Sequence, residues 1–337
     1  MRTPAKPSDL DLPTLDGRDA WWSLQQETIE QIVEAFDHHK YVLANIPTGG
    51  GKTIVGAAVQ KMLNVPSLAL THTKQLQQQY TETMPWAAVA TGRNNWPCGR
   101  PGDDPIRKLH ALVSRGKEMT AEDCDDCQHK GTCGYYQMLD RARMSQQVVM
   151  NYAYAIRILA GPLGRQSDDG PPSNPFWRPL LIADEGHLVE QAIVDAVAVS
   201  IWQGPCDEAK LPPWPRTNDT WAWKAWANDA EVEVYLARAL TYVSDQEDDM
   251  DALVKATRLL TRAKALRKAV NTIRAMDANE WAVSHDTKEA RLRPLWGWSV
   301  AQHRLWRHFD RVLLMSATLG DPKDLMKRLD IPPEQAV

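Results

Sequence analysis

The sequence predicts an α/β fold with a parallel sheet, and three features support this prediction. Short apolar runs, each about the length of one buried strand, alternate along the chain with segments of helical periodicity. A glycine-rich turn joins the first of these runs to a helix. Several later runs end in polar residues, at the edge where parallel sheets bind ligands. The expected strands lie at residues 41–44, 66–71, 146–152, 179–187 and 309–319.

The glycine-rich turn has the sequence of a phosphate-binding loop. Its glycines allow backbone N–H groups to point at phosphate oxygens, and the following helix adds a partial positive charge. Lys52 is expected to reach the β- and γ-phosphates, and the Thr53 hydroxyl to hold Mg²⁺. The competing interpretation is a turn that binds nothing. The stretch reads Asn45-Ile46-Pro47-Thr48-Gly49-Gly50-Gly51-Lys52-Thr53.

Two adjacent carboxylates, Asp184 and Glu185, follow the fourth apolar run. Asp184 is expected to hold Mg²⁺ through water, and Glu185 to orient and deprotonate an attacking water. Such a pair is common by itself. Beside a phosphate-binding loop it becomes informative, because the two motifs supply complementary halves of one nucleotide site.

Two further sets of polar residues are weaker candidates. Gln25, at the start of a helix expected at residues 21–36, is placed to bond an adenine edge through its amide; Gln26 is the alternative. Residues 71–74 follow the second strand and are candidates for contact with a phosphodiester backbone. For both sets the simpler interpretation is a helix surface or a helix cap.

Four cysteines between residues 87 and 150 predict a metal site. Their spacing is Cys-x25-Cys-x2-Cys-x5-Cys, in a segment that interrupts the α/β pattern. A tetrahedral zinc and a four-iron four-sulfur cluster both fit, and the spacing does not separate them. The alternative is that the four are unrelated buried thiols. Cys206 lies outside this group, and we expect it to be an ordinary packed thiol. The four are Cys98, Cys124, Cys127 and Cys133.

Residues 190–300 are expected to be mainly helical, with helices at 231–243 and 250–276. The second helix carries many basic residues, which predict a solvated face with a minority lining a nucleic-acid path. The net charge of −4 does not indicate a nucleic-acid binder, but it does not count against a single basic groove. No signal peptide or membrane span is visible, so we expect a cytoplasmic protein without membrane partners.

Taken together, these segments resemble the iron–sulfur DNA helicases of superfamily 2, the XPD/DinG group. The resemblance runs from about Gln25 to Leu319, in the family's order. It implies one RecA-like P-loop NTPase domain with an inserted metal-cluster domain and an inserted helical arch domain. The matching segments are residues 47–53 (motif I), 71–75 (motif Ia), 92–98 (start of the cluster domain), 148–152, 184–187 (the DEAH-like box) and 316–318 (motif III).

The resemblance also implies boundaries and roles. It places helicase domain 1 at residues 1–92, 145–192 and 305–337, an iron–sulfur domain at 93–144 and an arch-like domain at 193–304. It favours a 4Fe–4S cluster over zinc at the four cysteines. The implied roles are catalysis for Lys52, Asp184 and Glu185; ATP binding for Gln25, Pro47, Thr48, Gly49, Gly50, Gly51, Lys52 and Thr53; Mg²⁺ binding for Thr53 and Asp184; and coupling for His187, Ser316, Ala317 and Thr318.

The implied activity is ATP-dependent 5′→3′ translocation on single-stranded or forked DNA, of the kind used in DNA repair. Family members continue past motif III into a second RecA-like domain, and nothing after Leu319 matches it. Three interpretations stay open: the chain is a fragment of a longer protein, a split gene encodes that domain on a separate partner chain, or this is a degenerate member that no longer moves. The first two are favoured. The alternative, from a different class, is a non-motor, metal-bearing nucleic-acid-binding module that uses ATP as a switch.

Overall fold

The computed structural model of the chain describes residues 3–14, 17, 19–113, 127–159, 176–245 and 249–337. The chain forms two compact units, which are described separately below. Unit 1 comprises Met1–Gly92, Tyr135–Ala196 and Gly297–Val337, and unit 2 comprises Arg93–Gly134 and Val197–Trp296.

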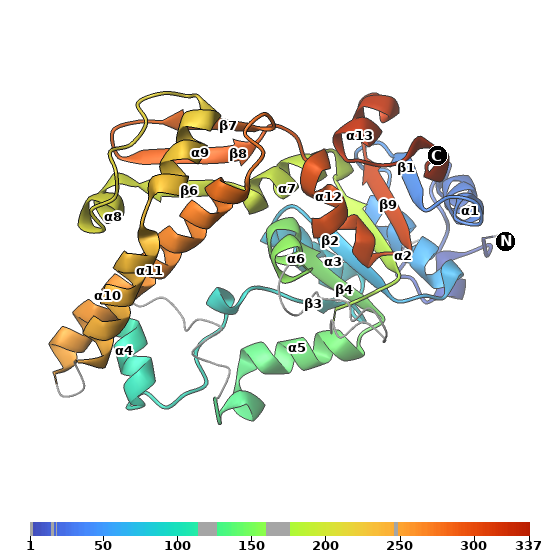
Figure 1. Cartoon of the computed structure of the whole chain (residues 1–337). Coiled ribbons are helices and arrows are strands. Elements are labelled where there is room, and N and C mark those ends of the chain that lie inside the picture. Colours follow the sequence, from blue (N-terminus) through green and yellow to red (C-terminus); the bar gives the residue numbers. More distant parts are fainter. Residues whose placement is uncertain (1–2, 15–16, 18, 114–126, 160–175, 246–248) are drawn as a thin grey trace, which may run out of the picture. The chain divides into compact units, whose positions relative to one another are not determined.

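Unit 1 is built on a six-stranded sheet in the order β1-β9-β5-β2-β4-β3, and all its strands pair in parallel (Figure 1). The predicted α/β class with a parallel sheet is confirmed. The carboxyl ends of β1, β5 and β9 lie side by side, because these three strands are neighbours. The strands are β1 Tyr41–Asn45, β2 Ser67–Thr71, β3 Ala88–Val89, β4 Gln147–Asn151, β5 Leu180–Asp184 and β9 Arg311–Ser316.

Helices connect the strands of unit 1, as parallel pairing requires. The helix expected at residues 21–36 forms as α1 over a shorter range, and the one expected after the phosphate-binding loop forms as α2. The α-helices are α1 Gln25–Ala35, α2 Lys52–Leu63, α3 Lys74–Thr83, α5 Gly134–Met144, α6 Tyr152–Leu159, α7 Val189–Val197, α12 Trp298–Arg304 and α13 Pro322–Arg328; short 3-10 helices lie at η1 Pro7–Leu10, η6 Gly186–Leu188, η7 Trp306–His308 and η8 Pro333–Gln335.

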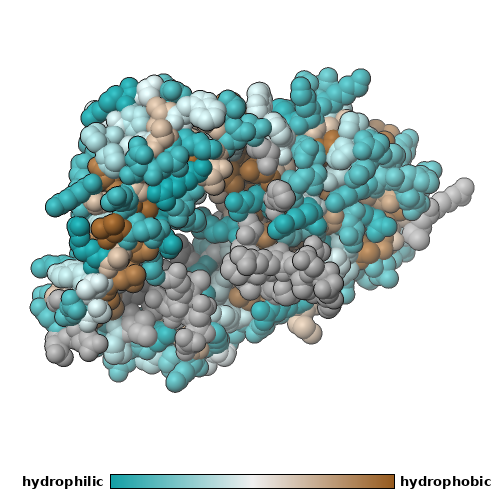
Figure 2. Space-filling model, viewed as in Figure 1, coloured by the Kyte–Doolittle hydropathy of each residue, from teal (hydrophilic) through white to brown (hydrophobic). Residues whose placement is uncertain are grey.

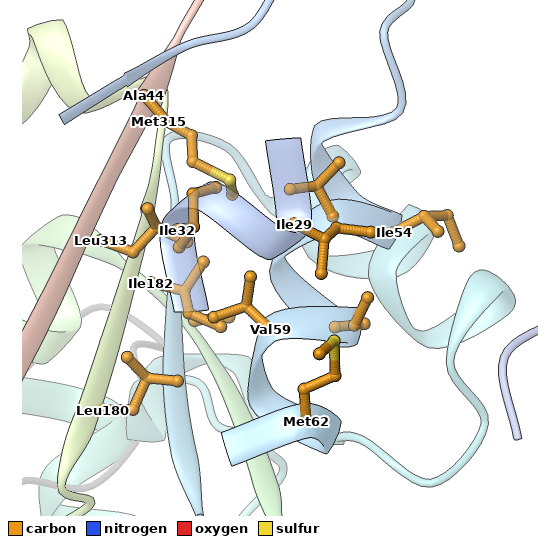
Figure 3. Close-up of a cluster of buried hydrophobic side chains, with 14 of the residues drawn as sticks. Ile29, Ile32, Ala44, Ile54, Val59, Met62, Leu180, Ile182, Leu313 and Met315 are labelled. Carbon is orange, nitrogen blue, oxygen red and sulfur yellow. The ribbon is translucent and has the colours of Figure 1, made fainter. Parts of the chain in front are cut away.

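The core of unit 1 lies between one face of this sheet and the helices α1 and α2. Figure 3 shows Ile29 of α1 and Val59 of α2 near Ile182 of β5 and Leu313 of β9. All four side chains are completely buried. Burial of each such side chain stabilises the fold by roughly 1.5–3 kcal/mol, so this layer holds the phosphate-binding loop between β1 and α2 in place.

Unit 2 is mainly helical, as predicted for residues 190–300, but it also has strands that the prediction lacked. It contains a three-stranded antiparallel sheet in the order β6-β8-β7, formed by β6 Val199–Trp202, β7 Trp281–His285 and β8 Glu289–Pro294. β7 and β8 form a hairpin whose turn is closed by the Asp286 carboxylate, which accepts bonds from the N–H groups of Lys288 and Glu289. Strands this short show too few alternations to be separated from loops in the sequence.

The two long helices predicted in unit 2 are present and lie side by side as α10 and α11 (Figure 1). Their bounds differ from the expected ones by one residue at most at each end. The helices of unit 2 are α4 Pro105–Val113, α8 Gln203–Glu208, α9 Thr220–Asp229, α10 Val232–Ser244 and α11 Met250–Ala275, with 3-10 helices η2 Arg93–Asn95 and η4 Lys130–Thr132.

Tryptophans form the centre of the unit 2 core. Trp223 of α9 is completely buried and contacts Trp214 and Trp226 edge to face, with ring centroids 5.5 and 5.7 Å apart. The Trp223 indole N–H donates to the carbonyl of Thr217 at 2.9 Å. Fourteen tryptophans against three phenylalanines is a strong bias in the sequence, and here three of them provide large packing area, with the indole N–H of Trp223 and of Trp226 donating to main-chain carbonyls.

The face drawn in Figure 2 is mainly hydrophilic, with hydrophobic residues in small separate patches. Among the described helices, none has both the length and the apolar character needed to cross a membrane.

Candidate functional site

The phosphate-binding loop connects β1 to α2 and has the backbone that its glycines permit. Gly49 and Gly51 have φ values of 78° and 72°, in the left-handed region that side chains disfavour. Lys52 is the first residue of α2, so the loop ends at the positive end of that helix. A side chain at Gly51 would also collide with the amide of Gln25. Such a loop can wrap an anionic group with backbone N–H groups.

Asp184 ends β5 beside this loop, and Glu185 follows it. Burial raises the pKa of Asp184 to about 6, the charge of Glu185 adds to the rise, and Lys52 opposes it. Glu185 has φ 55° and ψ 51°, an unusual backbone for a residue with a long side chain and one found often at functional sites. Its N–H donates to the Asp184 carboxylate at 3.0 Å, which fixes the two acids relative to each other.

Glu185 connects the two halves of the site. Its Oε1 lies 3.3 Å from Lys52 Nζ, and its Oε2 accepts a hydrogen bond from Ser316 Oγ at 3.2 Å. Ser316 Oγ also lies 2.7 Å from His187 Nδ1 and accepts from the N–H of Thr318 at 3.1 Å. A cation, a carboxylate, a hydroxyl and an imidazole from three separate segments thus form one network at the carboxyl edge of the sheet.

The segment 316–318 is joined to the phosphate-binding loop through the backbone. The N–H of Ile46 donates to the carbonyl of Ser316 at 2.8 Å. The Asn45 amide, with its nitrogen toward them, donates to the carbonyls of Ser316 and Ala317 at 3.0 and 3.2 Å. A shift of the loop would therefore be transmitted directly to residues 316–318.

Gln25 lies at the loop with its amide engaged by the protein. The side chain is 3% exposed, its oxygen accepts from the N–H of Trp22 at 2.9 Å, and its nitrogen donates to the carbonyl of Gly50 at 3.1 Å. The amide of Gln26 donates to the carbonyl of Thr3 at 3.2 Å. The structure therefore gives Gln25 a role in holding the loop, and its contact with adenine stays a prediction.

Part of the segment 71–74 caps a helix, which is the simpler alternative to contact with a phosphodiester backbone. Thr73 Oγ accepts from the N–H of Leu76 and caps α3, and Thr71 is fully buried with its hydroxyl donating to the carbonyl of Thr73. The His72 side chain is exposed. Thr73 is exposed as well, and contact of this segment with a nucleic-acid backbone stays a prediction.

Two buried tyrosines beneath the acids were not among the candidate site residues. Tyr152 donates from its hydroxyl to the main-chain carbonyl of Asp184 at 2.7 Å. Tyr80 of α3 is 2% exposed, and burial raises its pKa well above the usual value, with Asp184 adding to the rise. In the sequence Tyr80 falls in an expected helix and Tyr152 at the end of an expected strand, so only the packing shows that both lie beneath the acids.

Three of the four predicted metal-binding cysteines lie in described residues, and Cys124 lies outside them. Cys98, Cys127 and Cys133 are free thiols. The backbone at Gly99 packs on Cys133, since a Cβ there would meet the Cys133 Cβ at 3.2 Å. Burial lowers the pKa of Arg100, but the hydrogen bond to Asp104 and the nearby Cys127, Asp104 and Cys98 outweigh this effect and raise it. In the described part of the chain, no three such side chains are grouped closely enough to hold a metal ion.

The basic residues of α11 are largely engaged within unit 2. Arg262 pairs with Glu208 at 2.8 Å and Arg267 with Glu233 at 2.7 Å. Arg274 donates to the carbonyls of Ala227 and Ala230. For these three arginines, a structural role is therefore better supported than contact with nucleic acid.

Replacing Gly186 with alanine, the usual residue of the resembled motif, is expected to destabilise unit 1 by about 1–3 kcal/mol. An added Cβ would lie 3.1 Å from the Leu314 Cβ and 3.4 Å from a Leu319 methyl carbon, in a buried position. The free energy of unfolding, measured with urea, checks this. Gly204→Ala is the control, because its Cβ would meet nothing within 4 Å. Equal stability of the Gly186→Ala and parent proteins would contradict the expectation.

The raised pKa of Asp184 predicts a pH dependence. If Asp184 holds Mg²⁺ as the sequence predicts, a proton would compete with the ion for this carboxylate, and Mg²⁺-dependent nucleotide binding should weaken as the pH falls below about 6. An ordinary aspartate would show the same loss only near its usual pKa, about 4. Titration of nucleotide binding against Mg²⁺ at a series of pH values measures the effect. Constant Mg²⁺ affinity down to about pH 5 would contradict it.

Comparison with known proteins supplies a family and a fold. The family model described as type III restriction enzyme, res subunit, matches residues 20–202, and no curated protein matches the chain. A solved XPD helicase is similar at a TM-score of 0.56 and 14% identity, over 94% of this chain and 61% of that one. A truncated XPD matches at a TM-score of 0.46 and 14% identity, over 92% of this chain and 97% of that one. The structure of S. tokodaii Xpd4 matches at a TM-score of 0.46 and 14% identity, over 89% of this chain and 58% of that one. The chain thus shares the fold of the XPD helicase and spans 61% of its length.

Proposed function

Because the chain belongs to the family described as type III restriction enzyme, res subunit, we propose that it is the first motor domain of an ATP-dependent DNA helicase of the XPD type. The family domain is of the helicase superfamily, and it contains both the phosphate-binding loop and the acidic pair. The observation that carries the proposal is the 3.3 Å contact between Lys52 of that loop and Glu185 of that pair. It brings the phosphate-binding and water-activating groups of an ATPase to one place.

In the proposed reaction Lys52 and the loop residues 47–53 bind the ATP phosphates. Thr53 and Asp184 would hold Mg²⁺, which when bound neutralises charge on the phosphates. Glu185 accepts the proton of the attacking water. Its carboxylate contacts Lys52 at 3.3 Å, and phosphate oxygens would compete for that cation. ATP binding would therefore release Glu185 to act as the base.

The proposed coupling between ATP and DNA runs through His187 and residues 316–318. Ser316 contacts both His187 and Glu185, and Asn45 joins the phosphate-binding loop to the Ser316 and Ala317 carbonyls. A change at the γ-phosphate would alter these hydrogen bonds first. Translocation in the 5′→3′ direction on single-stranded DNA, and a second RecA-like domain as partner, belong to this proposal through the XPD resemblance.

We further propose that Cys98, Cys124, Cys127 and Cys133 bind a 4Fe–4S cluster, with zinc as the alternative. Four thiolates suit either occupant. The proposal is supported by the packing of Gly99, the neighbour of Cys98, on Cys133, and by the proximity of Arg100 to Cys98 and Cys127. The proposed iron–sulfur and arch-like domains, at 93–144 and 193–304, both contribute to unit 2.

The Cys124→Ser variant is expected to lose most of its iron and to be destabilised in residues 93–134, because three remaining thiolates hold a cluster poorly. Iron and sulfide content of protein purified without oxygen, together with hydrogen exchange of this segment, measure the two effects. Cys206→Ser is the control, since Cys206 is packed in the unit 2 core. Equal metal content in the Cys124→Ser variant and the parent would exclude Cys124 as a ligand.

The experiment that tests the proposed function measures ATP binding and hydrolysis with and without single-stranded DNA. The chain is expected to bind ATP, and DNA is expected to stimulate turnover when a second RecA-like domain is supplied. Lys52→Ala should abolish binding, because it removes the cation at the β- and γ-phosphates. Absence of ATP binding, or binding unaffected by Lys52→Ala, would overturn the proposal. ATP binding that alters DNA affinity without any turnover in the completed assembly would favour the ATP-switch module instead.

A further inference from the structure

The hydroxyl of Tyr80 is a buried polar group with no evident structural purpose. The side chain projects from α3, it is 2% exposed, and its oxygen is inaccessible to solvent without forming a hydrogen bond of good geometry. A phenylalanine would fill the same space without an unsatisfied hydroxyl. Buried polar atoms without partners are uncommon and disfavour folding, so the hydroxyl calls for a function.

The neighbours of this hydroxyl belong to the candidate metal site. Thr53, Asp184 and Glu185 all act on the Tyr80 oxygen, and Thr53 is close enough to interact without being aligned for a hydrogen bond. Burial first, and then the negative charges of the two acids, raise the pKa of Tyr80 well above its usual value.

Tyr152 is a second buried tyrosine near the acids, and its hydroxyl, unlike that of Tyr80, has a structural hydrogen bond. It is also buried beneath Asp184, but its hydroxyl donates to the Asp184 main-chain carbonyl at 2.7 Å. That bond satisfies the donor and fixes the end of β5. Tyr80 lacks such a bond, so its unused hydroxyl is what distinguishes the two.

We propose that Tyr80 is a positioning residue for the Mg²⁺ site, whose hydroxyl orients the side chain of Thr53. A threonine hydroxyl that ligates Mg²⁺ offers a lone pair to the metal and must direct its proton elsewhere. The Thr53 side chain lies within interacting range of the Tyr80 oxygen, and that oxygen can accept the proton. This inference rests on the proposed nucleotide site and goes beyond the residues assigned to it.

The test measures nucleotide binding by the full chain against Mg²⁺ concentration, using a fluorescent ATP analogue. Groups that support a metal ligand typically change metal affinity tenfold or more when removed. In Tyr80→Phe, the Mg²⁺ concentration for half-maximal binding is expected to rise about tenfold, while binding in EDTA stays that of the parent. Tyr235→Phe, at a buried tyrosine of unit 2, is the control and should leave both quantities unchanged.

A double-mutant cycle with Thr53→Ala separates this role from a packing effect. If Tyr80 acts through Thr53, the effect of Tyr80→Phe on Mg²⁺ dependence should vanish in the Thr53→Ala background. An unchanged Mg²⁺ dependence in Tyr80→Phe, or an effect that is equal in both backgrounds, would overturn the inference. A parent chain that binds no nucleotide at any Mg²⁺ concentration would instead refute the proposed function, so the two failures are distinguishable.

Discussion

Replacing Glu185 with glutamine is expected to lower the rate of ATP hydrolysis by roughly 10²–10⁴-fold while leaving ATP binding intact. Glutamine keeps the shape of the side chain but cannot accept the proton of the attacking water. It also removes the charge that engages Lys52 at 3.3 Å, so ATP affinity should stay the same or rise. Single-turnover hydrolysis and equilibrium binding of a nucleotide, measured on the same preparation, separate the two effects.

Glu190→Gln is the matched control for this prediction. Glu190 lies five residues further along the chain in unit 1, where it pairs with Arg328 at 2.9 Å and takes no part in the Lys52 network. Its replacement should leave hydrolysis unchanged. A Glu185→Gln variant that hydrolyses ATP at the parent rate would show that another group is the base and would remove the central role given to Glu185.

Replacing Trp223 with alanine is expected to destabilise unit 2 by about 3–5 kcal/mol. The indole is completely buried between two other tryptophans, and its N–H donates to the Thr217 carbonyl. Truncation would leave a large cavity and an acceptor without its donor. The free energy of unfolding of unit 2, followed by hydrogen exchange in α9 and α11 as urea is added, measures the loss.

Trp221→Ala is the control on the same helix. Its side chain is 56% exposed, so its replacement should change stability by no more than about 0.5 kcal/mol. Nucleotide binding by unit 1 should survive Trp223→Ala, because Lys52 and Glu185 belong to the other unit. Equal destabilisation by the two tryptophan variants would mean that the Trp223 cluster is not the centre of the core.

The residues at the site were largely predictable because their signals are local. The turn ending in Lys52 and Thr53 has a fixed order of residue types, and Asp184-Glu185 ends an apolar run. Parallel strands bring their carboxyl ends to one edge, so the meeting of these motifs follows from the fold class alone. The antiparallel sheet of unit 2 was missed for the opposite reason. Its strands are short, and its pairing of β6 with β8 joins residues about ninety positions apart.

The sequence by itself determined the α/β class, the phosphate-binding loop and the acidic pair, because each depends on the order of neighbouring residues. Tertiary structure alone decided what surrounds them. It directs the amide of Gln25 to Gly50, joins Ser316 to Glu185 and His187, and buries Tyr80 beneath the acids. These contacts connect segments far apart in the chain, and no local pattern of residue types specifies which distant side chain will fill a given space or satisfy a given polar atom.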